Sequence, residues 1–392
     1  MKLTITQIEK EIDNILPEIQ MIRRHLHAQP ELSLKEIRTC EFIRTHLEKL
    51  DVKLYDPFLT TDIVVLLSGK KAGKNVTLRA DIDALPLQEQ RDHSYRSTAN
   101  NVMHACGHDG HTAMLLGAAI ILDTLKDSFD GTVRFVFQPG EEIVAAGKEL
   151  ISKGVLENPK PDAVLAMHAW PGYPVGSICS KPGPFMAAAD IFTLTIKGKG
   201  GHGSAPDATI DPIFTASRVI NGLYLLSSRK MRAQDSLVIS IGSIQGGTTA
   251  NIIPGEVVMK GSVRYLSREV GDNIPALFEH AVKAECAYTG AGYDLEYSRP
   301  YITTVNNVQI VNRCKDITEK YLGKSCWIDI DEPVMGSEDF SYYIDKNPGA
   351  MFFLGMGEDS APLHSSLFDF NDEALRKGIM FLVLSTLEFL SK

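Results

Sequence analysis

Several apolar segments of strand length are each followed closely by residues that can bind a metal or transfer a proton. These segments alternate with helical ones, which is the pattern of an α/β protein. In open α/β sheets, the loops at the carboxyl ends of the strands converge and form the binding site. We therefore expect the polar residues after these strands to share one site. The predicted strands and the residues that follow them are 76–80 with Asp81 and Asp83, 132–138 with Glu141 and Glu142, 163–167 with His168, and 350–354 with His364.

A further segment, residues 103–111, reads Met-His-Ala-Cys-Gly-His-Asp-Gly-His and precedes a predicted helix over residues 112–125. Thiolate and imidazole are the side chains that hold zinc-like ions. Taken alone, this segment is as compatible with an ordinary loop as with a metal site, and Cys106 could also be the nucleophile of a Cys/His hydrolase. The other potential ligands at strand ends favour the metal site, because a cysteine hydrolase has no use for them.

Together these segments supply more ligands than one metal needs. A tetrahedral zinc ion takes three or four protein ligands, so five favour a pair of divalent ions that share a bridging ligand and a bridging water. A Glu-Glu pair is in general more often a solvated helix N-terminus, but this pair follows an apolar strand and Gln-Pro-Gly. Glu141 is then the general base that takes the proton from the water. The candidate metal ligands are Cys106, His108, Glu142, His168 and His364.

The middle of the chain has a different pattern, strand-helix-strand-strand-helix-strand, which is the split pattern of ferredoxin-like units. Strand-like segments resume after it. We therefore expect a small domain over residues 188–300, inserted into a catalytic domain made of residues 1–187 and 301–392. A glycine-rich loop at 197–204 carries His202. Its glycines indicate unusual backbone torsions or close approach to a ligand, although a flexible loop with an incidental histidine fits the spacing equally well.

Charge and composition exclude several classes of protein. The formal net charge is −9 and no basic stripe stands out, which argues against a nucleic-acid partner. The longest apolar runs, 113–122 and 379–387, are too short to cross a bilayer, and the first residues form no apolar signal core. The 6 cysteines have no framework spacing, which favours a reducing compartment. We expect a cytoplasmic protein without a membrane partner.

Longer motifs follow one another from about residue 22 to the C-terminus. They are Arg-Arg-His-Leu-His at 23–27, Pro-Glu-Leu at 30–32, Arg-Ala-Asp-Ile-Asp-Ala-Leu-Pro at 79–86, Met-His-Ala-Cys-Gly-His-Asp at 103–109, Gln-Pro-Gly-Glu-Glu at 138–142, Gly-Gly-His at 200–202 and Ser-Glu-Asp-Phe at 337–340. In type and order they resemble the aminoacylase-like amidohydrolases of the di-metal, zinc-exopeptidase type. That family includes hippurate hydrolases, N-acetyldiaminopimelate deacetylases and plant auxin-conjugate hydrolases.

The resemblance implies a catalytic domain with a mixed central sheet flanked by helices, and an inserted ferredoxin-like lid that commonly also forms a homodimer or higher oligomer. It implies two divalent ions, with Cys106 as the bridge; zinc suits these ligands best, and manganese, cobalt and nickel accept related sites. His202 would reach from the lid of the same or the partner subunit to stabilise the oxyanion. Asn251 would hold polar groups of the substrate. Arg264 is a candidate for the substrate carboxylate and equally for an ordinary strand residue.

The chain departs from related sequences at particular positions. Arg79 stands where related di-metal exopeptidases have a ligand histidine, which leaves Asp81 either orienting a ligand or supporting the structure. Asp207 stands where the family often has histidine, and we expect it to alter packing or charge at the entrance. Within the Cys-His segment, we expect His104 and His111 to be supporting residues. Asp109 is a candidate for orienting a ligand.

These observations predict an enzyme that hydrolyses N-acyl-L-amino acids, such as N-acetyl or N-benzoyl compounds, to a carboxylate and a free amino acid. Glu141 would assist the attack of a metal-bridging water on the amide carbonyl. A dipeptidase or exopeptidase using the same site is the alternative. A non-catalytic protein that binds an amino acid or a metal is a third possibility, and the intact general base and ligand set argue against it.

Overall fold

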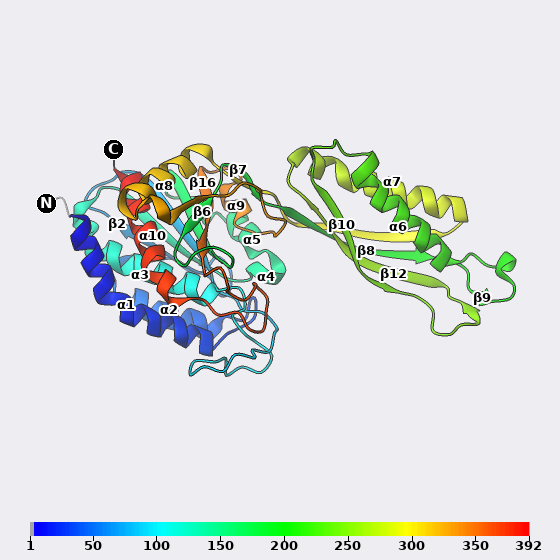
Figure 1. Ribbon diagram of the computed structural model, residues 1–392, viewed down its shortest axis with the longest axis horizontal. Helices are drawn as coiled ribbons and strands as arrows, with labels where there is room; N and C mark the ends of the chain where they lie inside the picture. The colour runs from blue at the N-terminus through cyan, green and yellow to red at the C-terminus, as the bar shows by residue number, and fades with distance from the viewer. Residues whose placement is uncertain (1–3, 392) are drawn as a thin grey trace. The chain divides into compact units, whose positions relative to one another are not determined.

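The computed structural model describes residues 4–391, and this part of the chain divides into two compact units (Figure 1). The second unit contains Met186–Thr304 and Pro333–Glu338, and the first contains the remaining described residues. The predicted insertion, residues 188–300, falls within Met186–Thr304, whereas the grouping of Pro333–Glu338 with that unit was not predicted. The role of 188–300 as a lid and dimerisation domain stays a prediction.

The first unit contains most of the regular elements. In chain order they are α1 (Ile5–Ala28), α2 (Ile37–Leu47), β1 (Val52–Leu54), β2 (Ile63–Ser68), β3 (Asn75–Asp81), α3 (His108–Thr124), β4 (Thr132–Gln138), α4 (Glu141–Val144), α5 (Ala146–Ser152), β5 (Ala163–Trp170), β6 (Ile178–Ser180), α8 (Val308–Tyr321), β15 (Trp327–Asp329), α9 (Ser341–Ile344), β16 (Gly349–Gly355) and α10 (Leu375–Leu390). Short 3-10 helices occupy Lys126–Ser128, Lys324–Cys326 and Asp372–Ala374. Strands β7 (Gly183–Met186) and β14 (Thr304–Asn306) pair with each other where the chain passes between the units.

The strands of the first unit form a mixed sheet with the order β1-β2-β4-β3-β5-β16-β6-β15. Strands β3, β4, β5 and β16 are parallel, so their carboxyl ends meet at one edge. The pairs β1–β2, β2–β4 and β6–β16 are antiparallel. This architecture confirms the predicted α/β fold with a mixed central sheet and helices on its faces.

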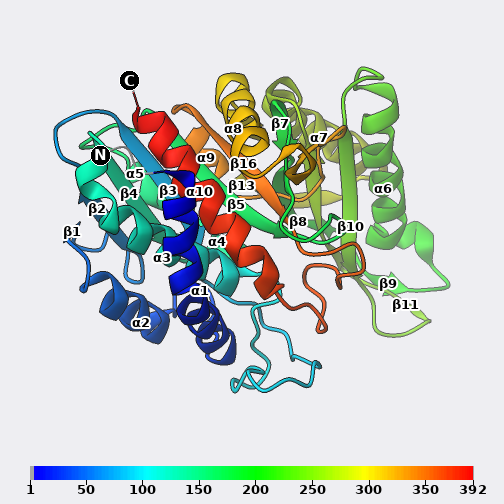
Figure 2. The same cartoon turned by 60° about the vertical axis from the view of Figure 1, so that its left-hand side comes forward.

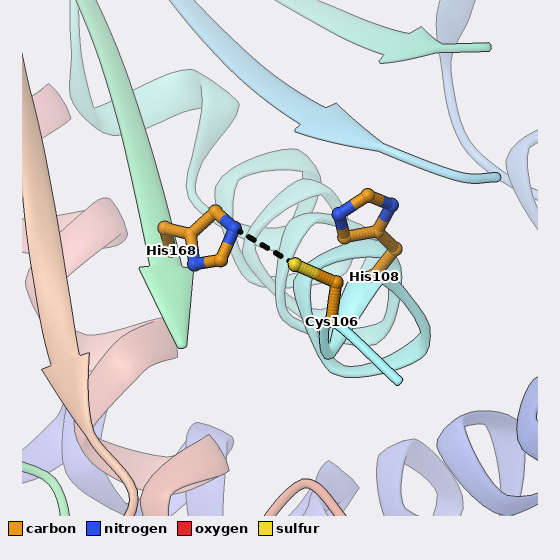
Figure 3. A group of neighbouring side chains, drawn as sticks. All are labelled: Cys106, His108 and His168. Atoms are coloured by element: carbon orange, nitrogen blue, oxygen red, sulfur yellow. Dashed lines mark hydrogen bonds between the residues drawn. The ribbon is translucent and has the colours of Figure 1, made fainter. Parts of the chain in front are cut away.

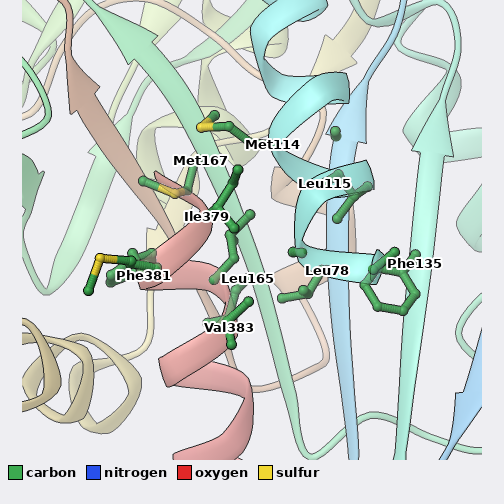
Figure 4. Close-up of a cluster of buried hydrophobic side chains, with 14 of the residues drawn as sticks. Leu78, Met114, Leu115, Phe135, Leu165, Met167, Ile379, Phe381 and Val383 are labelled. Carbon is green, nitrogen blue, oxygen red and sulfur yellow. The ribbon is translucent and has the colours of Figure 1, made fainter. Parts of the chain in front are cut away.

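One face of this sheet is covered by α3 and α10, which pack against each other and against α1 (Figures 1 and 2). Strand side chains such as Leu78, Phe135 and Leu165 point into this layer and meet Leu115 and Ile379 from the helices (Figure 4). The sequences of β5 and α3 explain this burial. Strands covered on both faces and a helix surrounded by other elements are apolar along most of their length, as these are. Helix α9 packs against β16 and against α5.

The second unit contains β8 (Ala188–Lys197), β9 (Gly201–His202), α6 (Pro212–Arg229), β10 (Leu237–Gln245), β11 (Ile252–Ile253), β12 (Glu256–Tyr265), α7 (Arg268–Thr289) and β13 (Gly292–Tyr301), with a 3-10 helix at Pro206–Ala208. Its main sheet has the order β10-β12-β8-β13, and each neighbouring pair is antiparallel. Helices α6 and α7 pack over this sheet and over each other. The strand-helix-strand-strand-helix-strand order agrees with the sequence-based prediction.

Some predicted boundaries were wrong in ways that bear on the site. Helix α3 begins at His108, four residues before the predicted start, because Gly107 takes a left-handed conformation and the helix starts directly after it. Strand β5 extends to Trp170, so His168 lies within the strand and not after it. Within residues 4–391, every helix is too short or too polar to cross a membrane.

Candidate metal centre

The candidate ligands gather at the edge where β3, β4, β5 and β16 end. Cys106 Sγ lies 3.5 Å from His168 Nε2, and His108 projects from the first turn of α3 toward the same point (Figure 3). One possible ligand atom from each of Cys106, His108 and His168 lies within 4.8 Å of the other two. The same holds for Cys106, Glu142 and His364. Cys106 therefore belongs to both groups, and all five predicted ligands come together.

The two buried histidines present the same ring atom to this point. His108 Nδ1 lies 2.8 Å from the carbonyl oxygen of Asp83, and His168 Nδ1 lies 2.7 Å from that of Ala169. A carbonyl oxygen only accepts, so each ring donates through Nδ1, and in the neutral ring the lone pair is then on Nε2. His108 Nε2 has no hydrogen-bond partner among residues 4–391. Histidines that bind metals are commonly fixed in this way.

Glu142 and His364 close the other side of the cluster. Glu142 Oε1 lies 3.4 Å from His364 Nε2 and 3.8 Å from His108 Nε2, and it is buried without a hydrogen bond to any described residue. The His364 side chain is 55% exposed. The backbone N–H of His364 donates to the carbonyl oxygen of Ala105, which ties the His364 loop to the residue before Cys106.

The chemistry of this donor set fits divalent cations. Burial raises the pKa of the Cys106 thiol well above its usual value, and the carboxylates of Glu142, Glu141 and Asp81 raise it further. A bound cation would favour the thiolate instead, because its charge offsets both effects. His108 Nε2 and Glu142 Oε1 are buried polar atoms without a hydrogen-bond partner among the described residues, and each would otherwise cost desolvation energy. These residues can therefore hold metal ions.

Glu141 stands next to the ligand cluster. It is the first residue of α4, follows the left-handed Gly140 and is buried. Its carboxylate lies within 4.8 Å of candidate ligand atoms of both His108 and Glu142. A carboxylate in this place can exchange a proton with a group bound at the metal centre.

Asp81 is fully buried behind the ligands and contacts two residues closely. Its Oδ1 lies 2.6 Å from His111 Nδ1, and its Oδ2 accepts a hydrogen bond of 2.8 Å from Arg79 Nη1. His111 Nε2 accepts a hydrogen bond of 2.7 Å from the backbone N–H of Ala169. His111 therefore has both ring nitrogens occupied and supports the residue after His168, as expected of a supporting residue.

The sequence left the roles of Asp83 and Asp339 unassigned. Asp83 Oδ2 accepts hydrogen bonds from Ser33 Oγ and from the backbone N–H of Glu142. Asp339, from the Ser-Glu-Asp-Phe motif, accepts from Arg79, Gln138 and the backbone N–H of Gly147. The motifs that contain these residues were the available signal, but motif type alone does not name the partner.

Among the described residues, neither Asp109 nor His104 forms a hydrogen bond with a candidate ligand. Asp109 was a candidate for orienting a ligand, but its Oδ2 lies 2.8 Å from His27 Nδ1 and 3.4 Å from Arg23 Nη1. That expectation was wrong, because neither partner belongs to the ligand set. His104 is buried, and its ring nitrogens have no hydrogen-bond partner among the described residues.

In the second unit, His202 and Asn251 lie side by side. His202 pairs with Ile252 in a short antiparallel ribbon of β9 and β11, and the backbone N–H of Gly203 donates to the carbonyl oxygen of Asn251. Both side chains are exposed. The ribbon was not predicted, because two-residue strands are too short to show a sequence period.

Arg264 lies toward the other end of this unit's sheet. It is eight residues after Glu256, where β12 begins, which corresponds to roughly 27 Å along an extended strand. Its Nη1 donates to the carbonyl oxygen of Met335 at 2.7 Å. Within the second unit, Arg264 is therefore not brought together with His202 and Asn251. Asp207 lies exposed in the 3-10 helix Pro206–Ala208.

Comparisons with known proteins agree with this geometry. Residues 77–387 match the model of Peptidase family M20/M25/M40. The chain is 38% identical to thermostable carboxypeptidase 1 of Saccharolobus solfataricus over 396 residues, 99% of each chain. It is 38% identical to N-acetylcysteine deacetylase of Bacillus subtilis over 356 residues, 90% of this chain and 92% of the relative.

A solved structure is similar over nearly the whole chain. It is a Bacillus subtilis protein described as a dinuclear metal binding peptidase from the M20 family, with a TM-score of 0.84 and 32% identity, and the match covers 96% of this chain and 99% of that one. These matches confirm the family resemblance seen in the motifs.

Proposed function

The chain belongs to the M20/M25/M40 peptidase family, a family of hydrolases, and from that premise we propose that it is a metal-dependent amidohydrolase that cleaves N-acyl-L-amino acids. The products are a carboxylate and a free amino acid. One observation carries the proposal: Cys106 belongs to two groups of potential ligands, and Glu141 lies beside them. The similarity to an N-acetylcysteine deacetylase supports an N-acyl substrate.

The metal centre takes two divalent ions. Cys106, His108 and His168 would hold one, and Cys106, Glu142 and His364 the other, with zinc favoured by the thiolate and imidazoles. When bound, such a pair supplies Lewis-acid activation of a water molecule and of the amide carbonyl.

The chain's own residues perform the proton transfers. The Glu141 carboxylate accepts the proton of the attacking water and returns it to the nitrogen of the leaving amino acid. Asp81 acts through His111, which holds the backbone beside His168. Cleavage of the C–N bond then releases a neutral amine and a carboxylic acid, and the acid gives up the second proton of the water to become the carboxylate.

The second unit supplies substrate contacts in this proposal. His202 would donate a hydrogen bond to the oxyanion, and the neighbouring Asn251 would hold a polar group of the substrate. Arg264 is the candidate for the substrate carboxylate. Residues 188–300 would act as the lid and as the surface of a homodimer.

A dipeptidase or carboxypeptidase is the second candidate function. The similarity to a thermostable carboxypeptidase favours it. Both reactions break an amide bond beside an amino acid carboxylate, so the same residues would serve both. The two functions differ in whether the group on the amide carbonyl carries a free amine.

A substrate panel on the reconstituted protein tests the proposal. The protein is stripped with a chelator, loaded with zinc, manganese, cobalt or nickel, and assayed with N-acetyl and N-benzoyl amino acids and with dipeptides. We expect no turnover without metal, restored turnover with metal, and a higher kcat/KM for N-acyl amino acids. A higher kcat/KM for dipeptides would establish the second candidate, and full activity without metal would contradict both.

A further inference from the structure

Large apolar side chains are exposed beside the candidate general base. Leu34 is 44% exposed, Ile143 is 58% exposed and Val144 is 46% exposed, although Glu141 and the ligand Glu142 directly precede the latter two in α4. Exposed apolar surface next to convergent polar groups is typical of a ligand site, since such sites are lined mostly by apolar side chains.

Leu34 and Val144 come from distant parts of the sequence but lie over the same glycine. A methyl group built on Gly140 would lie 2.8 Å from Val144 Cγ2 and 3.2 Å from Leu34 Cδ2. Gly140 directly precedes Glu141. We call Leu34 and Val144 together the apolar wall; it lies over Gly140, the residue directly before the candidate general base.

A buried carboxylate holds this wall in place. Glu36 Oε1 accepts hydrogen bonds from the backbone N–H groups of Leu34, at 2.9 Å, and of Gly140, at 3.0 Å. Its Oε2 accepts from Thr61 Oγ1 at 2.8 Å, and the residue is fully buried. The two turns that carry the apolar wall are thus fastened to each other.

The backbone of Leu34 adopts a strained conformation. Its φ is 61°, a value that bulky L-residues rarely adopt. Strain of this kind persists only where the surroundings impose it, and it clusters at functional sites. Asp83 accepts hydrogen bonds from Ser33 Oγ and from the backbone N–H of Glu142. Together with the bonds to Glu36, they fix the backbone on both sides of the apolar wall.

We propose that the apolar wall of Leu34 and Val144 receives the acyl group of the substrate, so that N-acyl amino acids with a bulky apolar acyl group are preferred over N-acetyl amino acids. This inference rests on the proposed function and names its substrate class. The amino acid half of such a substrate bears a carboxylate next to the scissile nitrogen. Setting that charge against the wall would cost desolvation energy, because the N–H groups of Leu34 and Gly140 already donate to Glu36.

The test uses the zinc-loaded full chain and one amino acid, L-alanine, carrying an acetyl, butanoyl, hexanoyl or benzoyl group. We expect kcat/KM for N-benzoyl-alanine to exceed that for N-acetyl-alanine by about tenfold or more, the size of effect that apolar pockets produce. Leu34→Ser and Val144→Ser should each lower this benzoyl-to-acetyl ratio by about tenfold.

Two further variants separate the loss of the side chain from effects on folding and on the protein surface in general. Leu34→Gly removes the side chain but accepts the positive φ, so it should fold as the wild type does and still lose the preference. Met21→Ser, on the exposed face of α1 where Met21 is 66% exposed, is the matched control and should keep the wild-type ratio. Metal content and melting temperature are measured for every variant.

The outcomes separate this inference from the proposed function. If the wild type hydrolyses N-acetyl-alanine as well as or better than N-benzoyl-alanine, the inference is overturned and the proposed function stands. The inference also fails if the wall variants keep the wild-type benzoyl-to-acetyl ratio. If only dipeptides are cleaved, the proposed function and the inference fall together.

Discussion

His111 Nδ1 lies 2.6 Å from Asp81 Oδ1, while His111 Nε2 accepts a hydrogen bond from the backbone N–H of Ala169. A ring nitrogen that accepts from an N–H group carries no proton, so His111 is neutral and its proton lies toward Asp81. Since Ala169 follows His168, this contact fixes the end of β5 beside the metal centre. Asp81 therefore acts on the His168 side of the centre through His111, while its Oδ2 also lies 3.7 Å from Nε2 of the candidate ligand His108.

Replacing His111 by alanine should weaken metal binding without abolishing folding. Residues that hold ligands in place typically change metal affinity by about 10–100-fold when they are removed. We expect a loss of that size for His111→Ala in a zinc titration. His280→Ala, which removes an exposed histidine of α7, should leave the zinc affinity unchanged. An unchanged affinity in His111→Ala would show that β5 keeps its position without this contact.

Removing the Cys106 thiol should reduce the number of bound ions. Because Cys106 belongs to both groups of ligands, Cys106→Ala leaves each group with two of its three members. We expect elemental analysis to find two zinc ions in the wild type and fewer than one tightly bound ion in the variant. Cys40→Ala is the control, since Cys40 donates to the carbonyl oxygen of Thr61 and lies in none of these groups. Two ions retained in Cys106→Ala would contradict the bridging role.

Adding a side chain at Gly107, which lies between the candidate ligands Cys106 and His108, should destabilise the folded protein. Its φ is 85°, and a Cβ there would lie 2.9 Å from Ala169 Cβ. Gly107→Ala should lower the free energy of unfolding of the metal-free protein by about 1–2 kcal/mol for the left-handed backbone and by a further ~1–3 kcal/mol for the close contact.

Gly172→Ala is the matched control for the backbone term. Gly172 has a φ of 87°, but nothing described lies within 4 Å of a Cβ built there. Only the left-handed cost of about 1–2 kcal/mol should appear in urea unfolding. Equal losses in the two variants would show that the contact with Ala169 relaxes freely.

The stability of the protein should fall as pH rises from 6.5 to 9. Burial alone would lower the pKa of His27, but Asp109 and Glu89, which contact its two ring nitrogens, raise it to about 9. The folded protein therefore keeps a proton that the unfolded chain releases near pH 6.5. The stabilisation is complete below pH 6.5 and is lost through pH 9, on the order of 3 kcal/mol.

Urea unfolding across this pH range measures the effect. In the zinc-loaded protein, where His108 would hold metal and not titrate, His27→Gln should remove most of the slope between pH 6.5 and 9, because glutamine does not titrate. The control His280→Gln should keep it, since His280 is exposed on α7. A slope that survives in His27→Gln would assign the pH dependence to other groups.

The gathering of the candidate ligands could be predicted, because each one's residue type and its place near a strand end or in the Cys-His segment are local properties of the sequence. The supporting contacts could not. Arg79 and Asp339 are 260 positions apart, and nothing local in either motif specifies that the guanidinium of Arg79 donates to the carboxylate of Asp339. The start of α3 was placed too late, because the apolar period begins after His111 whereas the left-handed Gly107 sets the true N-terminus.

In the second unit too, local features could be predicted from the sequence and contacts between distant residues could not. The strands and helices from Ala188 to Tyr301 were predicted well, because their alternating burial leaves a clear period in the sequence. The pairing of β9 with β11, which sets His202 beside Asn251, depends on contacts between distant residues and left no such pattern. The catalytic roles of His202, Asn251 and Arg264 stay predictions.

The most direct test of the account is the Glu141→Gln variant of the zinc-loaded protein, assayed for bound zinc and for hydrolysis of N-acyl amino acids. Glutamine keeps the shape of the side chain but cannot accept the proton, so we expect full zinc content and a fall in kcat of about 10²–10⁴-fold. Glu149→Gln, on α5, should match the wild type in both measurements. Undiminished hydrolysis in Glu141→Gln with zinc bound would contradict the assignment of the general base, and with it the mechanism proposed for this site.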